Sequence, residues 1–472
     1  MNPFFYNLLA RRTFLGRSAA GVGLAALSSL LVPASSRAAN PTRGVRIPAR
    51  TATAKRVIFL TQAGGPSHLE TFDPKPQLAK LDGGPMPTSF TEGQQLAQLQ
   101  GKALHCLGPQ FSFQRFGQAG IEICELFPHI GSVADELCIV RSMFTEQINH
   151  DPAHMFMNTG SRVAGFPSMG AWVTYGLGVE TEDLPGFVVL VSSGKGGQMQ
   201  PIASRQWSAG FLPGRYQGVK LNSIGTPVLY LDTPGGITRT AERESIDAIN
   251  ALNRHANHSL RDPELTTRIA QYEMAFRMQA SVPELTDMRG EPQATLQSYG
   301  CEPGDGSFAA NCLLARRLAE KGVRFIQLYH RDWDHHADIS TNIRIKAAEV
   351  DRATAALIKD LRQRGMLDDT LVIWGGEFGR TPMSQSGTGR DHHIKGFSFM
   401  LAGGGVKRGF TYGNTDELGY AAVENPVSVH DLHATMLHAL GIEPNSFSVR
   451  RQGLDARLVG IEGAQPVHDL LS

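Results

Sequence analysis

The sequence predicts an α/β protein with a central, mostly parallel sheet flanked by helices. Short apolar runs alternate along the chain with amphipathic runs, which is typical of repeated βαβ units. Most of the apolar runs are uninterrupted, as expected for strands that helices cover on both faces. No linker, charge block or internal repeat divides residues 40–472, so we expect them to form one large domain.

Six apolar runs are predicted to form strands. They are Val57–Thr61, Leu137–Val140, Phe187–Val191, Arg324–Leu328, Leu371–Trp374 and Phe397–Leu401. Five amphipathic runs are predicted to form helices, namely Thr240–Ala256, Glu264–Ala280, Asn311–Lys321, Asn342–Arg364 and His430–Leu440. Residues 192–235 are rich in Gly, Pro, Gln and aromatic residues without periodicity, and we expect a loop insertion there. Its Arg205, Trp207 and Phe211 suit a wall of a substrate cleft, or they hold the loop against the domain.

The first 39 residues have the composition of an export signal. Arg11 and Arg12 precede an apolar run over residues 19–32, and small residues up to Ala39 follow it. The apolar run is too short to span a bilayer, and no later stretch approaches that length. The Arg pair favours twin-arginine export over a Sec signal or an N-terminal anchor, so we expect a periplasmic or otherwise exported protein. Without this segment the formal net charge changes from +1 to −3, which argues against nucleic acid as a partner.

The five cysteines show no spacing typical of a metal site. Cys138 lies in a predicted strand and Cys312 in a predicted helix, where buried free thiols are expected. A disulfide between Cys106 and Cys124 stays open as an alternative.

Polar side chains follow four of the predicted strands. Because ligands bind beyond the carboxyl ends of parallel strands, these positions are the expected site. The first strand runs into a turn with His68, Glu70 and Asp73, although this composition also occurs in ordinary turns. After the second strand, His150 and His154 are four residues apart, so on a helix they face the same way. The alternative there is a helix start with two surface histidines.

The later strands are followed by denser groups. Asp334 and His336 lie in a polar run directly after a buried strand, where unpaired charge is costly. Glu377 follows the next strand, and Asp391 and His392 precede another. Mixed carboxylate and imidazole ligands suit Zn, Mn or Fe better than Mg or Ca. We therefore expect side chains of these polar runs to hold one or two divalent transition-metal ions, Zn or Mn, in a centre able to clamp an ester.

Several segments resemble the hallmark sequences of the DUF1501 family. They are residues 63–68, 333–336, 376–382, 389–393, 401–407 and 429–437. The resemblance covers most of residues 55–472 and implies an alkaline phosphatase/sulfatase-like fold with a one-metal or two-metal ester hydrolase site. It also implies that Glu377 stands at a ligand position and that Asp334, His336, Asp391 and His392 resemble the remaining ligands.

The sequence departs from the sulfatases and phosphatases of this superfamily at the nucleophile. In those enzymes the nucleophile stands ten residues before the Gly of a Thr-Gly pair, and that position here is His150. The formylglycine signature Cys-x-Pro/Ala-x-Arg is also missing, since Cys301–Asp305 lacks the Arg. Gln62 and Phe378 replace metal ligands, which weakens one of two metal positions. Three routes stay open: attack by a hydroxide activated at the metal, a covalent intermediate on His150, or loss of catalysis.

These observations predict an exported, metal-dependent hydrolase of sulfate or phosphate esters, acting on small-molecule or polysaccharide-derived substrates. Arg380 is expected to hold the anion by bidentate hydrogen bonds, with His150 and His154 at the anion pocket. One alternative is a non-catalytic exported protein of the same fold that binds metal or an anion. Another is a phosphoryl or sulfuryl transferase.

Overall fold

The structure is a computed structural model, and it describes residues 51–94, 96–192, 194–195, 200, 202–228, 237–260 and 262–472. The predicted export signal lies outside the described residues. The chain divides into two compact units, one containing Ile237–Tyr272 and the other containing Glu273–Ser472 together with the described residues before Gly236. The smaller unit consists of α7 (Arg239–Leu260) and the start of α8 (Pro263–Thr286).

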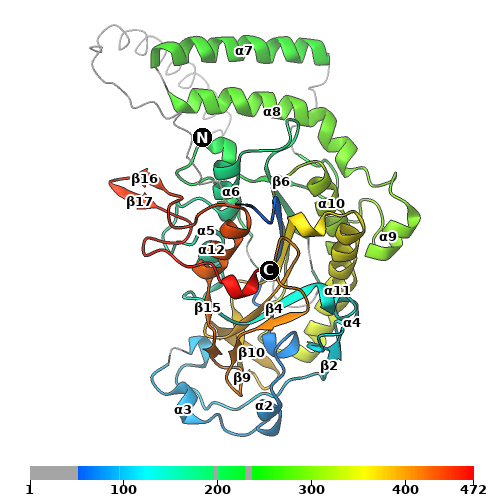
Figure 1. The fold of residues 1–472 in the computed structure, drawn as a ribbon, viewed down its shortest axis with the longest axis vertical. Coiled ribbons are helices and arrows are strands. Elements are labelled where there is room, and N and C mark those ends of the chain that lie inside the picture. Colours follow the sequence, from blue (N-terminus) through cyan, green and yellow to red (C-terminus); the bar gives the residue numbers. More distant parts are fainter. Residues whose placement is uncertain are drawn as a thin grey trace, which may run out of the picture. The chain divides into compact units, whose positions relative to one another are not determined.

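A nine-stranded sheet forms the centre of the larger unit, in the order β12-β4-β11-β8-β1-β7-β5-β6 with β15 beside β4 (Figure 1). Its strands are β1 (Arg56–Gln62), β4 (Leu137–Phe144), β5 (Phe187–Ser192), β6 (Val219–Leu221), β7 (Phe325–His330), β8 (Thr370–Gly375), β11 (Phe397–Ala402), β12 (Phe410–Tyr412) and β15 (Val427–Ser428). Neighbouring strands from β6 to β8 are parallel, and β11 runs antiparallel between β8 and β4. The predicted mostly parallel sheet is confirmed, and it contains all six predicted strands.

Helices cover both faces of this sheet (Figure 1). Successive residues of a strand point to opposite faces, so Ile58 and Leu60 belong to one hydrophobic cluster, while Val57 and Phe59 belong to another. The first cluster includes residues of α4 (Pro128–Gly131), α9 (Gln293–Tyr299), α10 (Phe308–Glu320) and α11 (Ile339–Gln363). The second includes residues of α5 (His150–Thr159), α6 (Met169–Leu177) and α12 (Val429–Ala439). Burial on both faces explains why the strands are continuous apolar runs.

Smaller elements surround the sheet. The short helices α2 and α3 span Pro76–Lys80 and Thr88–Thr91. Two-stranded sheets are formed by β2 (Phe113–Phe116) with β3 (Ile121–Cys124), β9 (Gly379–Gln385) with β10 (Gly389–His393), β13 (Asn414–Thr415) with β14 (Ala422–Glu424), and β16 (Val449–Arg451) with β17 (Leu454–Ala456). All five predicted helices are present as α7, α8, α10, α11 and α12.

The five cysteines are buried free thiols. Cys138 lies on β4 and Cys312 on α10, as expected, and Cys106 and Cys124 are not joined. Burial raises the pKa of Cys124 and of Cys138 to about 12, so both thiols are poor nucleophiles. In the described part of the chain, no helix combines the length and the apolar character that crossing a bilayer requires.

Candidate metal centre

The turns after three neighbouring strands carry the site. β1 pairs with β7 on one side and with β8 on the other, all in parallel. Gly64 follows β1, Asp334 follows β7 and Glu377 follows β8, so these residues meet at one edge of the sheet. Helix α5, which comes after β4, adds His150 and His154 at the same edge.

One group of ligand atoms comes from His150, Asp334, His336 and His392. His336 Nε2 lies 2.8 Å from Asp334 Oδ1 and 3.0 Å from His392 Nε2. Asp334 Oδ1 lies 3.4 Å from His392 Nε2, and its Oδ2 lies 3.2 Å from His150 Nε2. Donor atoms bound at roughly 2.0–2.2 Å to one ion are themselves about 3–3.5 Å apart. This group therefore has the dimensions of a site for one transition-metal ion.

Hydrogen bonds at the outer ring nitrogens show that these residues fit a cation. His336 Nδ1 bonds the side-chain oxygen of Gln385, and His392 Nδ1 lies 2.8 Å from the carbonyl oxygen of Ile148. Because both partners are acceptors, each Nδ1 carries the hydrogen and each Nε2 presents a lone pair. Two lone pairs that face each other at 3.0 Å repel unless a cation lies between them. Such outer-nitrogen bonds are typical of metal-binding histidines.

Asp334 is ionised in this arrangement. Its burial disfavours the charge, but the neighbouring imidazoles of His150, His336 and His392 and the charge of Arg380 outweigh the burial and hold the pKa of Asp334 well below its usual range. The group therefore contributes one permanent negative charge, as a site for a divalent cation requires.

A second group contains His150, His154 and Glu377. Glu377 Oε1 lies 2.5 Å from His150 Nδ1 and 3.4 Å from His154 Nε2. Among the described residues, neither ring nitrogen of the fully buried His154 has a hydrogen-bond partner. Burial opposes the charge on Glu377, but the nearby His154 and His150 hold its pKa at about 2. Burial lowers the pKa of His154, whose ring faces the Glu377 carboxylate in this second, smaller ligand set.

Two features of the surrounding chain hold the groups in place. Gly64 has a φ of +122°, and a Cβ there would lie 2.6 Å from the backbone nitrogen of Asp334. The Phe378 ring packs against both His150 and His392, with ring centroids 4.8 and 4.7 Å away, and these two imidazoles contact each other at 4.3 Å. Phe378 therefore supports two imidazoles by apolar contact. The resemblance implied that this position carries a metal ligand in similar enzymes.

The structure brings together four of the five predicted metal ligands, Asp334, His336, Glu377 and His392. It does not bring Asp391 into either group. The Asp391 carboxylate accepts the backbone N–H groups of Leu99 and His392 at 2.9 and 2.8 Å. Neighbouring residues of a strand point to opposite faces, so when His392 on β10 faces the site, Asp391 faces away. His150 and His154 lie within these groups, where they are candidate ligands, whereas the sequence predicted them at an anion pocket.

Arg380 differs from its predicted role. It is buried, and its guanidinium donates to the carbonyl oxygens of Gly64, Gly65 and Arg390 and to Asp334. Because these partners engage every nitrogen of the group, Arg380 does not face an open anion site. It positions Asp334 and the turn after β1 in place of the predicted bidentate contact with an anion.

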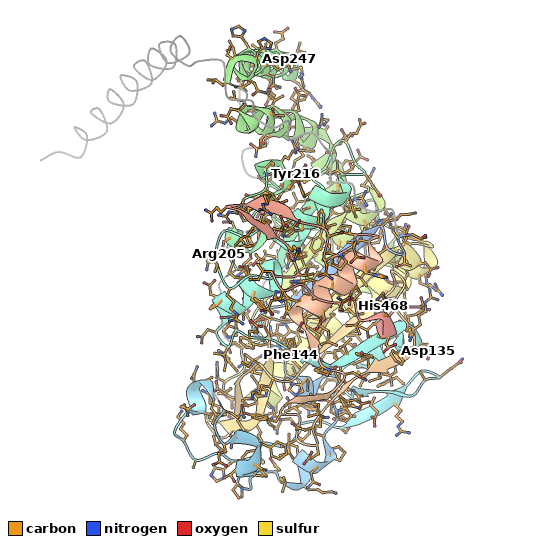
Figure 2. The ribbon with its side chains drawn as sticks, turned by 60° about the vertical axis from the view of Figure 1, so that its left-hand side comes forward. Asp135, Phe144, Arg205, Tyr216, Asp247 and His468 are labelled. Carbon is orange, nitrogen blue, oxygen red and sulfur yellow. The ribbon has the colours of Figure 1, made fainter. Side chains whose placement is uncertain are left out.

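The loop insertion also reaches the site. Gln200 donates to Asp334 Oδ2 at 3.0 Å, and Arg205 pairs with Asp151 of α5. Arg205, labelled in Figure 2, is a surface residue whose side chain is 49% exposed. Gln200 therefore brings the loop to the site, while Trp207 and Phe211 pack into the hydrophobic cluster on one face of the sheet. These rings hold the loop against the domain, which is one of the two interpretations that the sequence allowed. Neither Gln200 nor Gln385 was predicted, because a single amide in a loop or strand carries no local signal.

Replacing Gln385 by leucine is expected to weaken metal binding about 10-fold to 100-fold, because His336 loses the acceptor that fixes its tautomer. The affinity is measured by competition with a chelator. Gln363→Leu, at an exposed position of α11, is the matched control and should leave the affinity unchanged. Equal affinities for all three proteins would show that Gln385 does not orient a ligand.

Comparison with solved structures finds distant similarities. They include a phosphonate monoester hydrolase from Silicibacter pomeroyi (13% identity, 73% of this chain and 71% of that chain, TM-score 0.33). They also include the PsFucS1 sulfatase from Pseudoalteromonas sp. (12% identity, 82% of this chain and 68% of that chain, TM-score 0.35). A third is the lipoteichoic acid synthase LtaP from Listeria monocytogenes (10% identity, 88% of this chain and 78% of that chain, TM-score 0.34). At these TM-scores the similarity assigns no activity.

Comparison by sequence is more specific. No curated protein matches the chain. The model of the family described as "Protein of unknown function (DUF1501)" matches residues 54–471, which include both ligand groups and all strands of the central sheet. The chain therefore belongs to the DUF1501 family.

Proposed function

We propose that this protein is an exported, metal-dependent hydrolase of sulfate or phosphate esters with an alkaline phosphatase-like fold. The pair of facing Nε2 atoms on His336 and His392, beside the ionised Asp334, supports the proposal most strongly. This pair lies at the carboxyl edge of a parallel sheet, where α/β proteins bind their ligands. A bound Zn or Mn ion would supply Lewis acidity to an ester oxygen.

The chain's own residues divide the remaining work. Asp334, His336 and His392 would hold the ion, and Arg380 keeps Asp334 in position. Both ring nitrogens of His150 face carboxylates, so the ring is placed to hold and move a proton. In this proposal water attacks the phosphorus or sulfur atom, and His150 takes the proton that the water gives up. The bond to the ester oxygen breaks, and this oxygen leaves as an alcohol with the proton from His150.

Export is part of the same proposal and depends on the N-terminal segment. Arg11 and Arg12, followed by a short apolar run, support twin-arginine export. This pathway moves folded proteins, so a metal ion would be loaded before the protein leaves the cytoplasm.

The second candidate function is a non-catalytic protein that binds metal or an anion at the same site. His150 favours this non-catalytic function, because it stands at the position where sulfatases and phosphatases of the similar superfamily carry a hydroxyl or thiol nucleophile.

One experiment separates the two functions. Purified protein should carry a divalent transition metal and hydrolyse at least one member of a panel of sulfate and phosphate esters. A chelator should abolish this activity, and added Zn or Mn should restore it. Elemental analysis and product assays measure the two properties on the same samples. Metal-loaded protein without turnover on any ester would favour the non-catalytic function, and protein that never takes up metal would exclude the hydrolase.

A further inference from the structure

A second pocket lies at the same edge of the central sheet. Its volume is about 700 Å³, which is in the range of small-molecule sites. The residues at or just beyond the ends of β5, β6 and β7 line it, together with the first turn of α10 and the side of α11 that carries Glu349. None of the candidate metal ligands lines it, so this β5–β7 pocket is distinct from the two ligand groups.

The β5–β7 pocket presents positive charge. Lys195, Lys220 and Arg331 line it, and so does the N-terminal turn of α10, residues 307–309. Lys220 is exposed on β6 and therefore has the freedom to reach a ligand.

The two carboxylates of the pocket are already engaged. Glu349 accepts from Lys346 Nζ at 2.8 Å and from the backbone of Lys195 at 3.0 Å, and it lies 3.1 Å from His330 Nε2. Asp305 accepts backbone N–H groups, including that of Ser307 at 2.8 Å. Glu349 is thus paired with Lys346, while Asp305 meets the partial positive charge at the N-terminus of α10. The excess positive charge of the lining comes from Lys195, Lys220 and Arg331, which outnumber the two carboxylates and favour an anionic ligand.

The neutral part of the lining suits a sugar better than a nucleotide. Asn222 and Ser223 offer an amide and a hydroxyl, which match sugar hydroxyl groups. The aromatic rings that line the pocket belong to Trp207, Phe308 and His330, which are only 6%, 2% and 0% exposed. Among the described lining residues, none therefore presents an open aromatic face on which a nucleobase stacks.

The β5–β7 pocket adjoins the metal centre. Lys195 and Ile202 line the pocket, while Gln200, which lies between them in the chain, donates to Asp334. Trp207 of the pocket packs against Tyr329, with ring centroids 6.1 Å apart. Tyr329 in turn packs against His154, at 6.5 Å. These buried rings therefore form the wall that separates the pocket from the metal centre, and the wall is only two aromatic residues thick.

We propose that the β5–β7 pocket binds a second anionic group of the substrate. The substrate is then a saccharide with at least two sulfate or phosphate groups, one of which is hydrolysed at the metal centre while the other is held by the pocket. This inference rests on the proposed function, and it narrows the substrate class to polyanionic saccharides.

The test compares a disulfated disaccharide with its monosulfated counterpart, using calorimetric titration of the full chain loaded with Zn. Wild-type protein should bind the disulfated sugar at least 10-fold more tightly, because only this sugar fills both places. Lys220→Glu should abolish that preference, since it reverses a charge of the pocket without touching the metal ligands. Lys80→Glu, at an exposed position of α2, makes the same charge change elsewhere and should keep the preference.

Equal affinity of the wild type for the two sugars would overturn the inference, and so would an equal loss of the preference in both variants. Elemental analysis of the same samples separates this result from failure of the proposed function. If the protein holds metal but shows no preference for the disulfated sugar, only the inference about the pocket is refuted. Protein without metal that still prefers the disulfated sugar refutes the hydrolase and leaves the pocket as an anion site.

Discussion

Replacing His336 and His392 together by alanine is expected to reduce metal affinity by well over 100-fold. The loss should exceed the roughly 10-fold to 100-fold effect of removing an outer hydrogen-bond partner, because two ligand atoms disappear. Elemental analysis of purified protein measures the effect directly. Thermal unfolding gives a second measurement, since an ion present at 100 times its dissociation constant stabilises the native state by about 2.7 kcal/mol. Added Zn should therefore raise the Tm of the wild type and not that of the variant.

His468→Ala is the matched control for this prediction. His468 is exposed on the surface, as Figure 2 shows, and belongs to neither ligand group. The control should keep the metal content of the wild type. If the double variant also keeps it, the group around Asp334 is not the binding site, and the smaller group around Glu377 has to account for the metal.

Glu70→Gln is expected to lower the free energy of unfolding by about 3–5 kcal/mol, because it leaves a buried guanidinium without its counter-charge. Glu70 and Arg390 are both fully buried, and Arg390 Nη2 lies 2.6 Å from Glu70 Oε1. Arg390 also donates to the carbonyl oxygens of Leu107, Gly108 and Thr381. The pair thereby ties β10, which carries His392, to the turn after β1. Unfolding in guanidinium chloride measures the loss.

Asp287→Asn makes the same chemical change in an exposed pair. The Asp287 and Arg289 side chains are 40% and 82% exposed, so this variant should lose less than about 1 kcal/mol. Glutamine has nearly the volume of glutamate, which excludes a cavity as the cause of the effect at Glu70. Similar small losses in both variants would show that the buried pair contributes no more than an exposed one.

The central sheet was predictable because its strands are buried on both faces. β1, β5, β7 and β8 consist of almost uninterrupted apolar residues that no turn or surface helix would carry. Their order in space was not predictable in the same way, since β11 inserts antiparallel between β8 and β4 through contacts distant in sequence. Composition also gave no sign that α7 belongs to a separate unit, because its helical pattern resembles that of the other helices.

The candidate site was predictable where ligands cluster along the chain. His150 and His154, and likewise Asp334 and His336, are close in sequence and come directly after strands. The hairpin of β9 and β10 was missed, since Arg380, Asp391 and His392 have the composition of a solvated loop although all three are buried. Without that hairpin, the sequence did not reveal that His392 faces the site and Asp391 faces away.

The position of His150 between Asp334 and Glu377 has a thermodynamic consequence. A neutral imidazole has one nitrogen with a lone pair and one with a hydrogen. A cation that binds at one side takes the lone pair and leaves the hydrogen for the carboxylate on the other side. Each group then changes the affinity of the other, and it does so by the same factor in both directions. The two ligand sets share a single ring, so a cation bound in one set would change the affinity of the other set for a second cation.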